Sequence, residues 1–189
     1  MEQWHDIERK TKHEFDGLLA RDGHADHGFW YLFYEHLLEE LNVRDHAIHG
    51  SLVESTRVSA NWANLRPGTR DVLHRLLRRY RLAVISNADG KIAGLLQRNG
   101  IADCFESITD SGLVGCEKPA VPIFHQALAA MGVSGADSLY VGDVYSVDYV
   151  GATRAGMQAV LFDIAGAYRE SGAERVASLA ELETILQHR

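Results

Sequence analysis

The stretch "SLYVGDVYSVDYVGATRAGMQAVLFD", residues 138–163, contains two short apolar runs separated by a segment of helical length. The first run ends in Gly142 and Asp143, and a second aspartate, Asp148, follows five positions later. Short apolar runs joined through a helix favour a parallel βαβ unit, whose strands are covered on both faces. A buried carboxylate is costly unless a positive partner lies beside it. The stretch therefore predicts a parallel sheet and a polar site at the end of one strand.

The residues from 65 onward repeat this alternation of strand and helix. Strands are predicted in "RLAVISN" (81–87), "FESITDS" (105–111), "SLYVGD" (138–143) and "QAVLFD" (158–163). Helices are predicted in "LRPGTRDVLHRLLRRY" (65–80, with its stripe Val72, Leu73, Leu76 and Leu77), "KIAGLLQRNG" (91–100), "AVPIFHQALAAMG" (120–132), "VDYVGATRAGM" (147–157) and "SLAELETILQH" (178–188). Gly100 and Gly132 are expected to end their helices, and Ser178 with Glu181 to form a capping box. The fold class is therefore α/β, with a doubly wound parallel sheet.

The first third of the chain reads as helical. In "FWYLFYEHLLEELN", residues 29–42, the spacing of Trp30, Phe33, Leu37 and Leu41 predicts the apolar stripe of an amphipathic helix. The preceding "GHADHG", residues 23–28, reads as a solvated loop, with a metal site at His24, Asp26 and His27 as the alternative.

Composition excludes several classes of function. The chain has 189 residues, 46% of them hydrophobic, and a formal net charge of −7, so nucleic acid is not an expected partner. No apolar stretch approaches the roughly 20 residues of a membrane span, and the N-terminus does not read as a signal peptide. Cys104 and Cys116 are expected to be free thiols, and the protein to be cytoplasmic.

Polar residues follow the strand ends, where open parallel sheets bind ligands. Ser86 and Asn87 end one strand, Asp143 ends another with Asp148 beyond it, and Lys118 precedes a helix in "VGCEKPAVPIF", residues 114–124. Taken singly, these residues are explained by turn chemistry, a solvated lysine and a helix cap. Together they suit phosphoryl chemistry, in which a hydroxyl and N–H groups hold the phosphoryl group, a lysine neutralises it and carboxylates bind Mg²⁺.

Three segments together resemble a known family. "AVISNADG" (83–90), "GCEKPAVPIF" (115–124) and "YVGDVYSVDYVGATRAGM" (140–157) are similar to motifs two, three and four of the haloacid dehalogenase-like (HAD) hydrolases, in the small helical-cap subfamily of phosphoglycolate phosphatase and haloacid dehalogenase. The chain departs from the family at Ala120, where an aspartate is usual.

The resemblance implies a role for each residue of the predicted site. Ser86 would contact the phosphoryl group, helped by the backbone at Asn87, and Lys118 would stabilise the charge of the nucleophile and the phosphoryl group. Asp143 would bind Mg²⁺, and Asp148 would support the lysine or the metal. It also implies a Rossmann-like core over residues 65–189 and a helical cap over residues 1–64 that closes over the site.

One family motif is not found. Family members begin with a strand ending in DxDx[TV], which supplies the nucleophile and the general acid/base. The nearest string is "HEFDGLLA", residues 13–20, in which Glu14, Asp16 and Gly17 mimic the spacing, but polar residues precede it and Leu18 replaces the hydroxyl residue. A cap helix is the favoured interpretation. We therefore expect the first core strand to be missing, the cap to be truncated at its N-terminal side, and the chain to be inactive as a phosphatase.

Two functional hypotheses remain. The first is a Mg²⁺-dependent phosphatase that acts on a small phosphorylated metabolite through an aspartyl-phosphate; dehalogenase chemistry on the same scaffold is less favoured. The second is a non-catalytic descendant that binds phosphate and metal or acts as a regulatory module. A bare nucleotide-binding or receiver-like domain is disfavoured because neither a GxxxxGK[ST] loop nor a dinucleotide loop occurs. The sequence predicts neither the substrate nor the oligomeric state.

Overall fold

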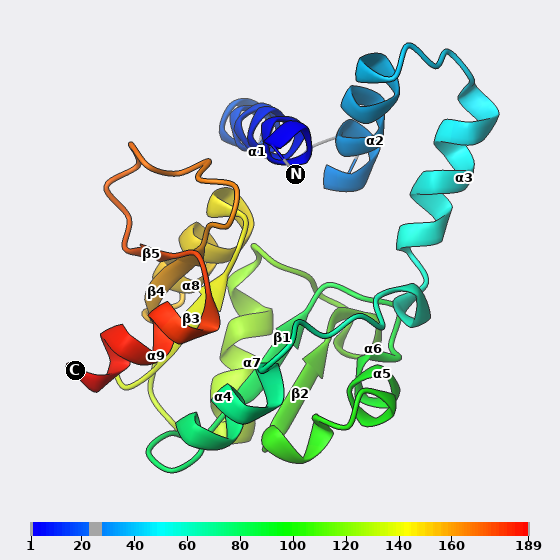
Figure 1. Ribbon diagram of the computed structural model, residues 1–189. Helices are drawn as coiled ribbons and strands as arrows, with labels where there is room; N and C mark the ends of the chain where they lie inside the picture. The colour runs from blue at the N-terminus through cyan, green and yellow to red at the C-terminus, as the bar shows by residue number, and fades with distance from the viewer. Residues whose placement is uncertain (1, 23–27, 189) are drawn as a thin grey trace.

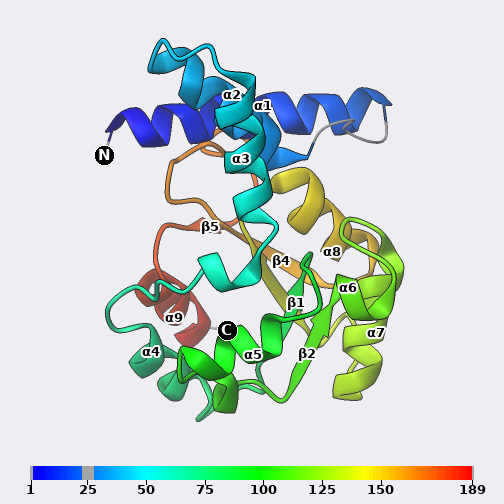
Figure 2. The same ribbon diagram turned by 90° about the vertical axis from the view of Figure 1, so that its right-hand side faces the viewer.

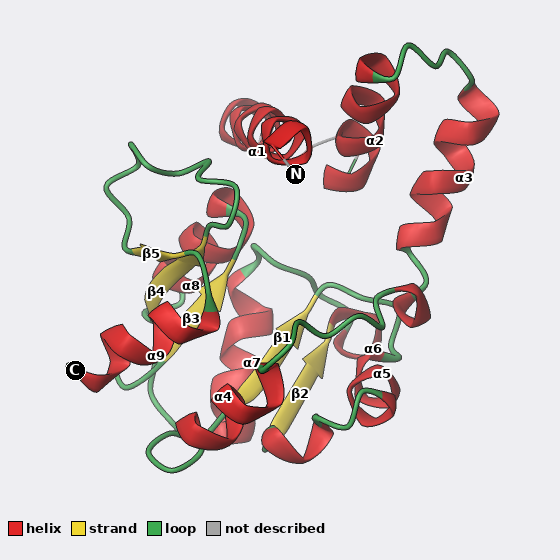
Figure 3. Cartoon of the chain, in the orientation of Figure 1, coloured by secondary structure: helices red, strands yellow, loops and turns green. Residues whose placement is uncertain are grey.

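The computed structural model describes residues 2–22 and 28–188. The predicted loop around His24, Asp26 and His27, and its metal-site alternative, fall mostly outside these residues. Helices are α1 (Glu2–Asp22), α2 (Phe29–Glu40), α3 (His46–Thr56), α4 (Thr69–Leu76), α5 (Ile92–Arg98), α6 (Ser111–Val114), α7 (Val121–Met131), α8 (Val150–Arg154) and α9 (Leu179–Gln187), with short turns η1 (Ser59–Asn61), η2 (Ala102–Cys104) and η3 (Tyr145–Tyr149). Strands are β1 (Ala83–Ser86), β2 (Ser107–Asp110), β3 (Leu139–Gly142), β4 (Gln158–Phe162) and β5 (Arg175–Val176) (Figure 3).

All strand pairs are parallel, as the sequence predicts, but the described strands form two sheets. One contains β1 and β2, and the other has the order β3-β4-β5. Within the described part of the chain, β1 pairs only with β2 and β3 pairs only with β4. The two strands whose ends carry Ser86 and Asp143 are therefore both edge strands, each with one row of backbone groups outside a ladder.

Helices cover both faces and join the two sheets (Figure 1). On one face, Ile123 and Phe124 of α7 are fully buried, and the Phe124 ring packs edge-on against Tyr140 of β3 with 5.2 Å between the ring centroids. Because α7 also contacts β1 and β2, it bridges the sheets. On the opposite face α4 meets α9, where the Arg75 guanidinium donates two hydrogen bonds of 2.7 and 2.9 Å to Glu183. The described core is therefore a mixed α/β fold with parallel sheets covered by helices.

Local signals explain most of the element boundaries. Gly100 and Gly132 follow α5 and α7 with φ of 67° and 63°, the left-handed conformation in which glycine ends a helix. The Ser178 hydroxyl accepts a 3.1 Å hydrogen bond from the Glu181 N–H at the start of α9. In α4, Val72, Leu73 and Leu76 of the predicted stripe are buried, whereas Leu77, just beyond the helix, is exposed. The two-residue strand β5 and the single-turn helix α6 are not predicted by the sequence.

The predicted apolar stripe of α2 is wrong. The buried residues of α2 are Leu32, His36 and Leu38, whereas Leu41 lies just beyond the helix and is 60% exposed. Helix α2 packs between α1 and α3, so two of its faces are covered. The aromatic rings pack on one another, with 4.7 Å between the centroids of Trp30 and Trp62. His36 is buried because its ring bonds the Thr11 hydroxyl and the Glu14 carboxylate, both at 2.9 Å.

Helix α1 lies across the carboxyl end of β3 and β4, above the loop that joins β4 to β5 (Figure 2). Arg9 donates to the Ala165 carbonyl at 2.8 Å, and the His13 ring lies 2.6 Å from the Ala167 carbonyl oxygen. Asp16 accepts 3.0 Å hydrogen bonds from the Ser146 N–H and the Tyr168 hydroxyl. The string "HEFDGLLA", residues 13–20, lies within helix α1. Its aspartate, Asp16, joins α1 to the core. Among the described helices, none is both long and apolar enough to cross a membrane.

Candidate functional site

Lys118 and Asp148 form a buried ion pair at the end of β3. The Lys118 ammonium donates to Asp148 Oδ1 at 2.7 Å and to the Tyr140 hydroxyl at 2.9 Å, and that hydroxyl donates to the same carboxylate oxygen at 3.1 Å. The side chains of Lys118 and Asp148 are 13% and 4% exposed. Burial by itself would lower the pKa of Lys118, but the charge of Asp148 and the contact with Tyr140, together with the hydrogen bonds to both, outweigh burial and raise it. The lysine therefore carries a fixed positive charge at neutral pH.

Asp148 also shapes the loop that follows β3. Its Oδ2 accepts hydrogen bonds from the backbone N–H groups of Asp143, at 3.0 Å, and Val144, at 2.9 Å. The carboxylate lies directly over Gly142, where a Cβ would overlap its atoms. Each oxygen of Asp148 thus accepts two hydrogen bonds. Glycine is needed at position 142 because any side chain there would overlap the Asp148 carboxylate.

Asn87 connects the end of β1 to the lysine loop. Its amide group donates to the Lys118 carbonyl at 3.0 Å, and its side-chain oxygen accepts from the Lys118 N–H at 2.8 Å. This reciprocal pair fixes the backbone of Lys118 relative to Ser86, the last residue of β1. Across the described chain, the Ser86 hydroxyl has no hydrogen-bond partner. Ser86 therefore offers a free hydroxyl beside a positioned lysine loop.

Sequence reasoning missed Asp110, which shapes the loop after Ser86. Asp110 ends β2, is 1% exposed, and accepts hydrogen bonds of 3.0 to 3.1 Å from the N–H groups of Gly90, Ile92 and Gly112. The neighbouring Ser111 hydroxyl accepts from the Ala88 N–H at 2.9 Å. Asp110 also lies at the end of a predicted strand, so the sequence marks it as a candidate site residue. Nothing in the sequence indicates to which loop its carboxylate is hydrogen-bonded.

Asp143 lies at the mouth of the site, with 59% of its side chain exposed. Its Oδ2 is 3.3 Å from the ammonium of Lys12, which projects from α1 and is 1% exposed. Crowding by neighbouring protein atoms raises the pKa of Asp143, and the Lys12 charge partly offsets that rise. Because water still reaches over half of the side chain, we expect the rise to be small. Lys12 lies in a polar helix and carried no sequence signal for this contact.

The two predicted metal-binding aspartates differ in whether a carboxylate oxygen is free to bind a metal ion. In residues 2–22 and 28–188, no group of three or more His, Cys, Asp or Glu side chains is arranged to hold a metal ion. Asp148 is saturated by its donors, whereas Asp143 Oδ1 has no partner in the described structure. Mg²⁺ commonly uses one or two carboxylates with water and phosphate oxygens, so Asp143 fits as a single protein ligand.

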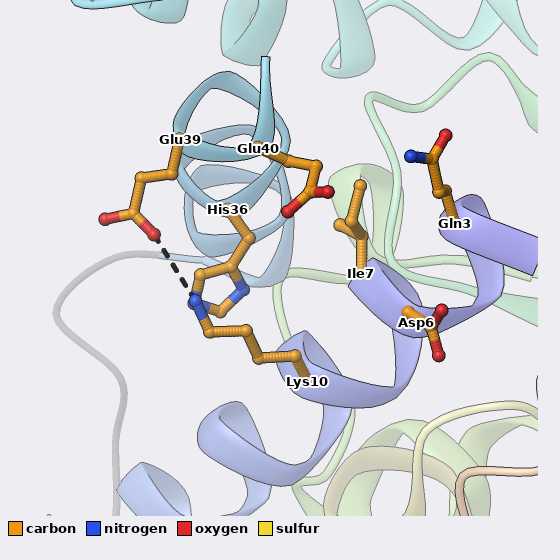
Figure 4. A pocket seen from close by; sticks show the side chains of 7 residues that line it. All are labelled: Gln3, Asp6, Ile7, Lys10, His36, Glu39 and Glu40. Carbon is orange, nitrogen blue, oxygen red and sulfur yellow. Dashed lines mark hydrogen bonds and ion pairs between the residues drawn. The ribbon is translucent and has the colours of Figure 1, made fainter. Parts of the chain in front are cut away.

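A separate cavity of about 370 Å³ lies between α1 and α2. It is lined by Gln3, Asp6, Ile7, Lys10, His36, Glu39 and Glu40, and Lys10 pairs with Glu39 across it at 3.3 Å (Figure 4). None of the residues at the strand ends lines this cavity. Its acidic side chains are therefore not part of the site described above.

Polar groups that suit a phosphoryl group, a lysine–aspartate pair and a free serine, thus lie at the carboxyl ends of strands in a parallel α/β core. Residues 4–156 match the family model of the haloacid dehalogenase-like hydrolases. The chain belongs to this family.

Individual relatives agree with this assignment. A glyceraldehyde 3-phosphate phosphatase of Methanothermobacter thermautotrophicus is 45% identical over 83 residues, which are 43% of this chain and 37% of that protein. A HAD phosphatase of Thermococcus onnurineus superposes with a TM-score of 0.63 at 23% identity, covering 98% of this chain and 92% of that one. The HAD-hydrolase YfnB of Bacillus subtilis bound to magnesium gives 0.64 at 19% identity, covering 96% and 82%. The matched segments span between 32% and 57% of the length of the curated relatives.

Proposed function

We propose that the ends of β1 and β3 form the phosphoryl-binding site of a Mg²⁺-dependent phosphatase whose substrate is a small phosphorylated metabolite. The observation that carries the proposal is the buried Lys118–Asp148 pair, whose lysine backbone is bonded by Asn87, the residue that follows Ser86 at the end of β1. A fixed positive charge and an unpartnered hydroxyl on two connected strand-end loops suit a phosphoryl dianion better than a neutral ligand. The relative named as a phosphatase of glyceraldehyde 3-phosphate supports a sugar phosphate of similar size.

Each residue has a defined task in this proposal. The Ser86 hydroxyl and the N–H of Asn87 would hold phosphoryl oxygens, and Lys118 would neutralise their charge. Asp148 would keep the lysine ammonium in place, and Asp143 would hold Mg²⁺. When bound, the metal ion supplies further positive charge to the phosphoryl oxygens.

We further propose that the described residues do not supply the nucleophile. Six carboxylates lie near the strand ends, and each already has a hydrogen-bond or ion-pair partner: Asp16, Asp89, Asp110, Asp143, Asp148 and Asp163. In the family pattern, the nucleophilic aspartate ends a strand lying between those that end at Ser86 and Asp143. The separation of β1 from β3 into two sheets is consistent with a place for such a strand.

We therefore propose that residues 1–189 by themselves bind phosphate and metal without turning over a phosphomonoester. This same observation favours the second candidate function, a non-catalytic phosphate- and metal-binding module. The segment 1–64 would act as a cap in either case, because α1 already lies across the carboxyl ends of β3 and β4.

Titration of inorganic phosphate in the presence of Mg²⁺, followed by calorimetry, tests the binding proposal. The variant Ser86→Ala is expected to bind at least tenfold more weakly than the unmodified chain, with unfolding free energy unchanged within about 0.5 kcal/mol because the hydroxyl has no protein partner. Ser51→Ala, on exposed α3, is the matched control and should bind as the unmodified chain does. Equal binding by Ser86→Ala and Ser51→Ala would refute the site.

Hydrolysis of para-nitrophenyl phosphate separates the two candidate functions. We expect no Mg²⁺-dependent turnover above that of the Ser86→Ala variant. Turnover that is lost in Ser86→Ala but kept in Ser51→Ala would establish a phosphatase whose nucleophile lies within these residues, and would overturn the proposal that the chain alone is inactive.

A further inference from the structure

Lys12 is the largest fully buried side chain in the described structure, and it carries a charge. Its ammonium lies 2.8 Å from Glu8 on the same helix, 3.3 Å from Asp143 Oδ2 and 5.7 Å from the centroid of the Tyr168 ring. Neither ion pair has the alignment of a hydrogen bond, so this buried donor is left unsatisfied. A buried charge requires a compensating partner, and Asp143 is the one that the core provides.

The partner of Lys12 is also the carboxylate proposed to hold Mg²⁺. Asp148 is not a substitute, because four donors already saturate its two oxygens. An ammonium and a divalent cation on the same carboxylate would repel each other strongly, because the Lys12 ammonium is shielded from water. Lys12 and a bound divalent cation are therefore competitors for Asp143.

We propose that Lys12 is a built-in counter-ion of Asp143 that a divalent cation displaces, so that metal binding weakens the attachment of α1 to the core. This inference rests on the metal site of the proposed function. The displaced ammonium is 1% exposed and keeps Glu8 of its own helix as its ionic partner, so we expect α1 to shift with Lys12 as the ammonium moves toward water. The other contacts of α1 with the core, made by Arg9, His13 and Asp16, involve the loops that follow β3 and β4, so a shift of the helix disturbs them together.

The affinity for Mn²⁺, measured by electron paramagnetic resonance of the free ion, tests the competition. Lys12→Met keeps the length of the side chain and removes the competing charge, so its affinity for Mn²⁺ should be at least tenfold higher than that of the unmodified chain. Lys10→Met is the matched control, because Lys10 lies on the same helix and pairs instead with Glu39. It removes the same charge from α1 and should change the affinity less than twofold.

Hydrogen exchange followed by mass spectrometry tests the coupling to α1 in the unmodified chain, and so does not depend on the folding of Lys12→Met. Saturating Mg²⁺ should speed exchange of the backbone amides of residues 2–22 severalfold and leave those of α7 unchanged. In Lys12→Met, where no ion pair remains to be broken, Mg²⁺ should not alter exchange in α1.

Asp143→Asn separates failure of this inference from failure of the proposed metal site. If Asp143→Asn abolishes Mn²⁺ binding while Lys12→Met binds no more tightly than Lys10→Met, the metal site stands and the competition is refuted. If Asp143→Asn binds Mn²⁺ as the unmodified chain does, the metal does not use Asp143, and both the metal site and the inference are refuted. Slower or unchanged exchange of α1 with bound Mg²⁺ would refute the coupling.

Discussion

Replacing Lys118 with methionine removes the charge that faces Asp148 and keeps most of the volume of the side chain. Removing one partner of a buried ion pair typically costs about 3–5 kcal/mol, because the other charge is left without compensation. Here Asp148 retains the N–H groups of Asp143 and Val144 and the Tyr140 hydroxyl, and Lys118 is 13% exposed. We therefore expect the lower end of the range, a loss of about 3 kcal/mol in the free energy of unfolding.

Urea unfolding followed by far-ultraviolet circular dichroism measures this loss. Tryptophan fluorescence is less suitable, because Trp4, Trp30 and Trp62 all lie in the N-terminal helical segment. Lys91→Met is the control, since the Lys91 side chain is 74% exposed and its removal should change stability by no more than about 0.5 kcal/mol. A loss below about 1 kcal/mol for Lys118→Met would refute the view that the pair anchors the site.

A double-mutant cycle with Asp148→Asn and the pH dependence sharpen this test. The double variant should lose less stability than the sum of the single variants, by about 1–3 kcal/mol, because neither charge is then left alone.

Asp148 raises the pKa of Lys118 above its ordinary value of 10.5 in the folded state. The stabilisation is therefore complete below pH 10.5 and is lost only as pH rises through the higher folded-state pKa. The difference between Lys118→Met and the unmodified chain should be constant between about pH 6 and pH 9.

Three further predictions concern the surroundings of the pair. Asn87→Ala should lose about 1–2 kcal/mol, because two hydrogen bonds to the Lys118 backbone disappear, and phosphate binding should weaken in calorimetry. Gly142→Ala should cost about 1–3 kcal/mol in urea unfolding, because its Cβ overlaps Asp148; a neutral effect would contradict the packing described. Tyr168→Phe should speed amide exchange in α1 at least twofold, since its hydroxyl joins α1 to the core; unchanged exchange would show that this bond does not hold the helix.

The strands and most helices of the core could be predicted because their signals are local. The apolar run that ends at Ser86, and the glycines that end α5 and α7, act through near neighbours in sequence. The association of Lys118 with Asp148 was one of two alternatives, because a resemblance of motifs brings residues to one edge of a sheet without fixing which side chains meet. The structure shows that they do meet.

The remaining features depend on contacts between distant segments. The buried face of α2 could not be read from its apolar spacing, because α1 and α3 both pack on it and His36 is buried through bonds to α1. The contact of Lys12 with Asp143 could not be predicted, because Lys12 lies in a helix whose polar sequence predicts a solvated face. The side-chain role of Asn87 was missed because the turn residue was considered only for its backbone.

The claim that Ser86, Lys118 and Asp143 form one phosphoryl- and metal-binding site is tested most directly by a crystal structure of residues 1–189 with Mg²⁺ and inorganic phosphate. The account predicts phosphate within hydrogen-bond distance of the Ser86 hydroxyl and the Lys118 ammonium, with Mg²⁺ on Asp143 and Lys12 moved away from it. Phosphate bound elsewhere, or Mg²⁺ bound away from Asp143, would contradict it.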